Sequence, residues 1–155
     1  MSRFRRSLLA FALLTGATAS AHAANPTMFR DAGCGCCLKW LAQVKASFKA
    51  PVTVVNAADM AAVKDKQGVP QALRSCHTVL VGGYVIEGHV PAKEIARLLR
   101  EKPKGVKGLA VAGMPMGSPG MEHGDHREAY TVMTFGTGGQ RVYASYAASS
   151  GAHAH

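Results

Sequence analysis

The stretch DAGCGCC, residues 31–37, decides the fold, because it places a C-x-x-C pair, Cys34 and Cys37, where a helix is predicted to begin. Four apolar side chains then recur at roughly helical spacing and predict a helix that ends before Pro51: Trp40, Leu41, Val44 and Phe48. Backbone N–H groups and the helix dipole at a helix start favour thiolate over thiol. The cysteines of this stretch are therefore predicted to be good nucleophiles or good metal ligands, rather than small buried apolar side chains.

The segments around this stretch predict an alternation of strands and helices. Apolar and β-branched runs predict the strands, and Gly82-Gly83 is a strong signal for a two-residue hairpin. The predicted elements are a strand over Pro26–Arg30, a helix from Cys37, a buried strand over Val52–Val55, a helix over Ala58–Lys66, strands over His77–Val81 and Tyr84–Glu87, and a helix from Pro91. This β-α-β-α-β-β-α order is thioredoxin-like, so we predict an α/β protein whose mixed sheet is flanked by helices.

The composition of the chain changes after Lys107. Residues 108–125 are rich in Gly, Pro and Met and predict a loop. Two further runs, Tyr130–Phe135 and Arg141–Tyr146, flank the Gly-rich residues 136–139 and predict a hairpin. We therefore expect a C-terminal Met/Gly-rich loop and β-hairpin to follow the thioredoxin-like part.

The N-terminus predicts export. A short apolar run, residues 8–14, and a small-x-small cleavage site, residues 21–23, follow three basic side chains: Arg3, Arg5 and Arg6. This pattern is typical of a secretory signal peptide, which we place over residues 1–24, and it predicts a periplasmic protein.

After cleavage, we expect one thioredoxin-like metal-binding domain over residues 25–148 and a disordered, His-containing tail over residues 149–155. Loss of the three arginines lowers the formal net charge from +9 to +6. The remaining Lys and Arg residues are scattered rather than arranged as a stripe, so nucleic acid is not an expected partner. No later segment is apolar for long enough to be a transmembrane helix.

The predicted topology brings a fourth cysteine to the cluster. In a thioredoxin-like order, the strand after the second helix starts beside the C-x-x-C loop, and thioredoxins carry a cis-proline there. This chain has Ser75, Cys76 and His77 at that point and no proline. The hairpin that follows returns toward the same end, so His89 is expected near the cluster, with an ordinary loop histidine as the alternative.

The spacing of the four cysteines favours metal binding. Disulfides among three cysteines within four residues would close almost no loop and would add little stability. Neighbouring side chains on a helix point about 100° apart, so Cys36 and Cys37 do not suit a single tetrahedral zinc ion. Crowded thiolates can instead bridge several soft ions, above all Cu(I). An iron–sulfur cluster is the other multinuclear option, and export makes it less favoured.

The Gly-rich loop adds further soft donors. It contains three methionines and two histidines within residues 113–126: Met114, Met116, Met121, His123 and His126. Thioether and imidazole ligands in an oxidising compartment are typical of copper handling. The alternative is that these methionines fill gaps over the core. His153 and His155 are expected in a solvated tail.

Several segments together resemble the CopG-like periplasmic copper-resistance proteins: residues 34–37 with Trp40, residues 68–70, residues 75–78, residues 83–92 and residues 113–122. The resemblance covers roughly the whole chain after the signal peptide. One departure is Ala112, where the family is expected to have proline. This difference concerns the stiffness of the loop and not the ligand set.

The resemblance implies a thioredoxin-like fold that holds a polynuclear copper cluster. Its bridging thiolates would be Cys34, Cys36, Cys37 and Cys76. It also implies a role in copper tolerance that includes interconversion of Cu(I) and Cu(II). From expected proximity we add six further candidate ligands: His77, His89, Met114, Met116, Met121 and His123.

Two alternatives remain open from the residues alone. The first is a metal-free thiol–disulfide oxidoreductase that uses Cys34 and Cys37. The second is a passive chaperone that hands copper to another periplasmic copper-handling protein. A copper oxidoreductase would differ from the chaperone in changing the oxidation state of the metal.

Overall fold

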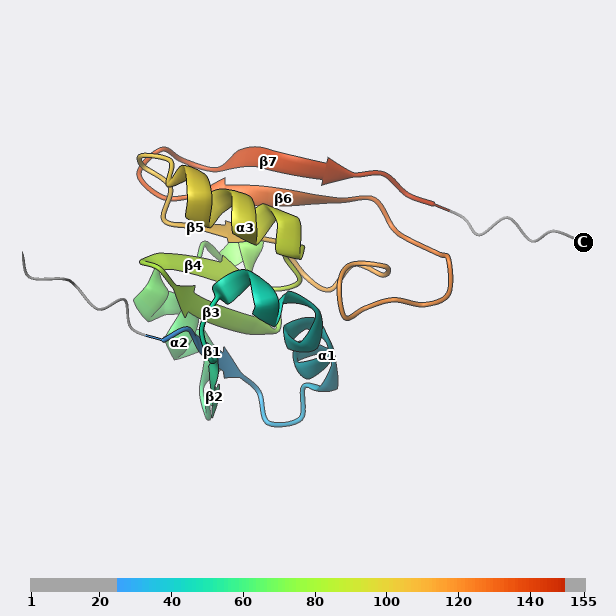
Figure 1. Ribbon diagram of the computed structural model, residues 1–155, viewed down its shortest axis with the longest axis horizontal. Helices are drawn as coiled ribbons and strands as arrows, with labels where there is room; N and C mark the ends of the chain where they lie inside the picture. Colours follow the sequence, from blue (N-terminus) through green and yellow to red (C-terminus); the bar gives the residue numbers. More distant parts are fainter. Residues whose placement is uncertain (1–24, 150–155) are drawn as a thin grey trace, which may run out of the picture.

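The computed structural model describes residues 25–149, which form one seven-stranded mixed sheet and three α-helices (Figure 1). The strands are β1 (Thr27–Arg30), β2 (Thr53–Asn56), β3 (His77–Val81), β4 (Tyr84–Glu87), β5 (Gly108–Ala110), β6 (Tyr130–Phe135) and β7 (Arg141–Tyr146), and the helices are α1 (Gly35–Val44), α2 (Met60–Gln67) and α3 (Ala92–Glu101). The predicted signal peptide and the last six residues of the predicted tail lie outside the described residues.

The strand order across the sheet is β2-β1-β3-β4-β5-β6-β7. The β1–β2 and β4–β5 pairs are parallel, and the other neighbouring pairs are antiparallel. In the β1–β3 pair, Arg30 lies opposite His77. The chain therefore leaves β1 toward the cysteine loop at the same end of the sheet where it enters β3.

Alternate residues of the strands build a core on each face of the sheet. Ile86 and Leu109 join the larger core cluster, which includes Trp40 of α1 and the α3 residues Ile95 and Leu98. Their chain neighbours Val85 and Ala110 join a second cluster with Val69 and Leu73, which follow α2. Helices α1 and α3 thus cover one face, and α2 lies behind the other face, where it is drawn fainter in Figure 1.

Helix α1 begins two residues earlier than the sequence pattern predicts. Cys34 is its N-cap residue and has an extended backbone, and the helix buries Cys37, Trp40 and Val44 on one side. Their spacing of three and four residues forms a single apolar face. The C-x-x-C pair therefore spans the first turn, with Cys34 at the cap and Cys37 against the core.

Two strands differ from the prediction. The run Val52–Val55 was expected to be a buried strand, but β2 is exposed along its whole length because it is the sheet edge and pairs with β1 alone. β5 was predicted to be part of a loop, but its residues are buried between β4 and β6. β5 thereby joins the predicted C-terminal hairpin, β6–β7, to the main sheet. No helix within residues 25–149 has the length and apolar character needed to cross a bilayer.

The Met/Gly-rich loop packs against α1 at Gly120. This residue has φ +82°, and a Cβ atom built on it would lie 2.6 Å from the backbone nitrogen of Trp40 and 2.9 Å from the carbonyl oxygen of Cys36. Both neighbours are backbone atoms of a helix, so they cannot move aside cheaply. Only glycine allows the loop to approach the helix this closely.

We expect Gly120→Ala to lower the free energy of unfolding by more than about 2 kcal/mol, because steric overlap adds to the backbone strain. Gly124→Ala is the matched control: Gly124 also has a positive φ, +55°, but a Cβ there would meet nothing within 4 Å. Strain alone should cost about 1 kcal/mol at that position. Urea unfolding of both variants measures the difference, and equal losses would contradict the close approach.

Candidate metal centre

Arg30 holds the cysteine loop in place from the end of β1. Its guanidinium donates hydrogen bonds to the carbonyl oxygens of Ala32, at 2.7 Å, and Cys34, at 2.9 Å, and to the side-chain oxygen of Asn56, at 3.0 Å. The side chain is buried, so these charge-assisted bonds lie out of water and are strong. Nothing in the sequence marks Arg30 as part of the site, because its role depends on partners in other segments.

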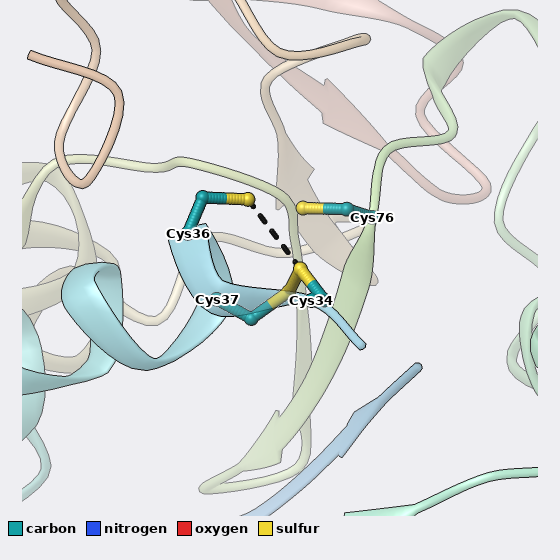
Figure 2. Close-up of side chains that lie close together, drawn as sticks. All are labelled: Cys34, Cys36, Cys37 and Cys76. Carbon is teal, nitrogen blue, oxygen red and sulfur yellow. Dashed lines mark hydrogen bonds between the residues drawn. A yellow bond between two sulfur atoms is a disulfide. The ribbon is translucent and has the colours of Figure 1, made fainter. Parts of the chain in front are cut away.

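The four cysteine sulfurs come together, as the topology predicts. Their Sγ atoms all lie within 4.8 Å of one another. Cys34 and Cys37 form a disulfide, and Cys36 Sγ lies 3.4 Å from Cys34 Sγ. Figure 2 shows the side chain of Cys76, at the start of β3, pointing toward Cys36 on the first turn of α1. A thiolate ligand must be free, so all four sulfurs can bind metal together only after the disulfide is reduced.

Two histidines meet Cys76 on the inner side of the sulfur cluster. The Nε2 atom of His89 is 3.0 Å from Cys76 Sγ, and the Nδ1 atom of His77 is 3.3 Å from the same sulfur. These three side chains form a second group whose ligand atoms lie within 4.8 Å of one another. Cys76 belongs to both groups and so connects the thiols to the imidazoles.

A backbone carbonyl sets the tautomer of His89. Nδ1 lies 2.8 Å from the carbonyl oxygen of Pro119, which can only accept a hydrogen bond. The proton of the neutral ring therefore sits on Nδ1, and the lone pair of Nε2 faces Cys76. A metal-binding histidine commonly has such a partner on its second ring nitrogen. Pro119 was not singled out in the sequence, because a backbone acceptor leaves no signal in residue type.

His77 is fully buried between two aromatic rings. The centre of its ring is 4.3 Å from that of Trp40 and 5.2 Å from that of His89. Among the described residues, its Nε2 atom has no hydrogen-bond partner. The packing fixes the ring so that Nδ1 stays directed at Cys76.

Burial determines the protonation states in this centre. Burial and the nearby Cys36 thiol raise the pKa of Cys76 to about 12, so the free side chain is a thiol at neutral pH. Burial lowers the pKa of both His89 and His77, and the neighbouring His89 ring and the Lys64 ammonium oppose protonation of His77 further. Both imidazoles are therefore neutral, with one lone pair each for a metal ion, and binding at Cys76 must release a proton.

The predicted methionine ligands and His123 line one pocket that adjoins Cys36. The pocket has a volume of about 370 Å³, and its walls include Met114, Met116, Met121 and His123. Met114 is 52% exposed, so it does not fill a gap over the core. The structure thus brings these soft donors beside the sulfur cluster, on its solvent side. Of the other histidines, His126 is paired with His123 in a short β-bridge, and His153 and His155 lie outside the described residues.

The fold and these side chains define an α/β protein with a cysteine cluster capable of binding metal. A family described as "Protein of unknown function, DUF411" matches residues 73–121. Two solved structures of copper resistance protein CopG, forms 1 and 2, share 44% sequence identity with this chain at a TM-score of 0.72. The first match covers 79% of this chain and 96% of that one, and the second covers 78% and 96%.

This chain belongs to the CopG copper-resistance family, and the resemblance found in the sequence is confirmed. No curated protein matches the chain. Family membership and the cysteine cluster together support a copper-related role.

The two neutral histidines make stability depend on pH. Their folded pKa values lie below the unfolded value of 6.5, so their contribution is fully present above pH 6.5 and is lost as pH falls toward the folded values. We expect the urea midpoint of the reduced, metal-free protein to decrease between pH 7.5 and pH 5. His77→Leu should flatten this dependence. An equal pH dependence of the wild-type chain and His77→Leu would contradict burial of a neutral His77 imidazole.

Proposed function

We propose that this protein is a periplasmic copper-binding protein of copper resistance, which holds more than one copper ion on Cys34, Cys36, Cys37 and Cys76. The observation that carries the proposal is the approach of all four Sγ atoms to within 4.8 Å. Thiolates select soft ions, and among ions met outside the cytoplasm Cu(I) is the softest common candidate. The disulfide between Cys34 and Cys37 must open before copper can occupy all four positions.

The geometry of α1 supports a polynuclear site over a mononuclear one. Cys36 and Cys37 are consecutive on the first turn, and Cys37 is fully buried while Cys36 is half-exposed. Side chains directed so differently suit separate ions that share bridging sulfurs. We propose that His89, through Nε2, and His77, through Nδ1, complete the coordination on the Cys76 side. We assign Met114, Met116, Met121 and His123 to the outer side, where copper would arrive.

We further propose that the bound copper gives one electron to, or takes one from, an external redox partner and so changes between Cu(I) and Cu(II), which would make the protein a copper oxidoreductase. Sulfur and imidazole donors lie within reach of one another around Cys76, and this mixture can serve both oxidation states. A passive chaperone would use the same ligands without a change of oxidation state. Metal transfer to another periplasmic copper-handling protein, with the oxidation state followed by electron paramagnetic resonance, separates the two roles.

We propose that β1 to β4 with the three helices form a thioredoxin-like unit within a domain over residues 25–148. The order β2-β1-β3-β4, with a parallel β1–β2 pair and antiparallel β1–β3 and β3–β4 pairs, supports this assignment. So does the place of Cys76, directly before β3. Residues 1–24 would be the signal peptide that directs this domain to the periplasm.

The copper hypothesis predicts the metal content of the reduced protein. Native mass spectrometry during titration with Cu(I) should show more than one ion per chain. Cys36→Ser should lower the number by at least one, because a bridging sulfur is lost. Leu38→Ser is the matched control, since Leu38 is an exposed residue on the same turn of α1 and should not alter uptake. Uptake of a single ion, or uptake unchanged in Cys36→Ser, would contradict the polynuclear site.

A metal-free thiol–disulfide oxidoreductase is the second candidate, and the Cys34–Cys37 disulfide at a helix start favours it. On this hypothesis, the metal-stripped protein should catalyse the reduction or isomerisation of disulfides in a substrate protein. Cys37→Ser should abolish this activity, and Cys76→Ser should leave it intact. Turnover no faster than that of a free dithiol would rule this candidate out.

A further inference from the structure

A buried ion pair lies directly behind the Cys76 side of the metal centre. The Nζ atom of Lys64, on α2, is 2.6 Å from Oε1 of Glu87, the last residue of β4. Glu87 is fully buried and Lys64 is 5% exposed, and residues of these types are almost never buried this deeply unless they are paired, as they are here. Desolvation of two charges is costly, and a buried pair is weak evidence that the pair serves stability. Its contacts point to another role.

The Glu87 carboxylate accepts hydrogen bonds from the residues on either side of the Cys76-His77 pair. Its Oε1 atom accepts a hydrogen bond from the backbone N–H of Ser75, at 2.7 Å, and its Oε2 atom accepts one from the hydroxyl of Thr78, at 2.6 Å. Lys64 also donates to the Thr78 hydroxyl, at 3.0 Å. The two candidate ligands therefore lie between two anchor points on one carboxylate.

Glu87 supplies a hydrogen-bond acceptor for the backbone N–H of Ser75, which no neighbouring strand provides. β3 begins at His77, so the N–H of Ser75 lies outside the β3–β4 ladder and has Glu87 as its acceptor. Gly88 packs tightly on the same residue: a Cβ built on it would lie 2.4 Å from the Cβ of Ser75. Its N–H donates to the carbonyl oxygen of His77, at 2.9 Å.

The same short segment carries both the anchor and a ligand. His89 follows Glu87 by two residues, and its Nε2 atom lies 3.0 Å from Cys76 Sγ. The contacts of Glu87 and Gly88 thus connect the start of β3, next to Cys76, with the end of β4, next to His89. The separation of these two donor atoms depends on this connection.

We propose that Glu87, supported by Lys64 and Thr78, is a positioning residue that holds Cys76 Sγ and His89 Nε2 at the separation needed to share a soft metal ion. This role rests on the copper function proposed above. Outer partners that orient ligands in this way commonly change metal affinity about 10- to 100-fold when they are removed.

Two double variants test the role of the carboxylate separately from its charge. Lys64→Leu with Glu87→Gln removes both charges and keeps an oxygen that can accept from Ser75. Lys64→Leu with Glu87→Leu removes the charges and the acceptor together. Neither introduces a thioether that could bind copper, and neither leaves a buried charge unpaired. Thermal unfolding establishes that each variant is folded.

The first measurement uses reduced, metal-free protein and follows alkylation of Cys76 by mass spectrometry. We expect the Leu variant to react several-fold faster than the Gln variant, because a half-buried thiol that loses its anchor opens more often. The second measurement is Cu(I) affinity against a competing chelator. We expect about tenfold weaker binding in the Leu variant and near wild-type binding in the Gln variant.

Equal behaviour of the two double variants, whether both retain or both lose these properties, would overturn the positioning role. If the wild-type chain takes up no Cu(I), the proposed function fails, and the alkylation comparison alone decides the role of Glu87. Should a double variant not fold, Thr78→Val replaces it, because this change removes the hydrogen bonds of the Thr78 hydroxyl with Glu87 and Lys64 but removes no charge. Thr78→Val should speed alkylation of Cys76 relative to wild type, and an unchanged rate would overturn the proposal.

Discussion

The register of the β1–β3 pair is the constraint on which the rest of the centre depends. It places Arg30 opposite His77, so the cysteine loop leaves β1 beside the point where Cys76 enters β3. A slip by one residue would turn every side chain of β3 to the opposite face and remove His77 from its place beside Trp40. Buried residues on both strands oppose such a slip, since Met28 pairs with Val79 in the core. One antiparallel pairing thus joins two sequence segments whose paired residues are 47 to 53 positions apart.

The same sulfur atoms serve two exclusive states. A sulfur in the Cys34–Cys37 disulfide is not a thiolate, so closing this bond removes two of the four soft donors. Cys36, Cys76 and the two imidazoles remain, so the oxidised centre offers two free sulfurs in place of four. The number of sulfurs that are free to bind metal therefore depends on whether this disulfide is open or closed. The two candidate functions therefore use the same cysteines: the oxidoreductase needs the Cys34–Cys37 disulfide, and the copper site needs the reduced thiolates.

The sequence was informative where a topology could be inferred from pattern. The β-α-β-α-β-β-α order was enough to bring Cys76 and His89 to the cluster, because strand direction fixes the end at which each residue lies. Position within the sheet was harder to infer. β2 is a run of β-branched residues that would suit a buried strand, yet it forms an exposed edge. β5 has three residues, too few to show an alternation, and only its neighbours make it a strand. Arg30, Glu87 and Lys64 appear in the sequence as ordinary surface charges, since burial depends on partners distant in the chain.

The Met/Gly-rich loop packs beside the sulfur cluster and against α1. Gap-filling methionines would be buried, whereas Met114 is 52% exposed; Met116 and Met121 are half-buried. The loop is nevertheless held firmly, because Gly120 lies against the backbone of α1 and the carbonyl of Pro119 accepts from His89. The segment that sets the tautomer of an inner candidate ligand therefore also presents thioethers at the solvent side of Cys36. Thioethers in the pocket beside Cys36 are what the proposed uptake of copper from the solvent side would use, whereas a purely structural cover has no need of them there.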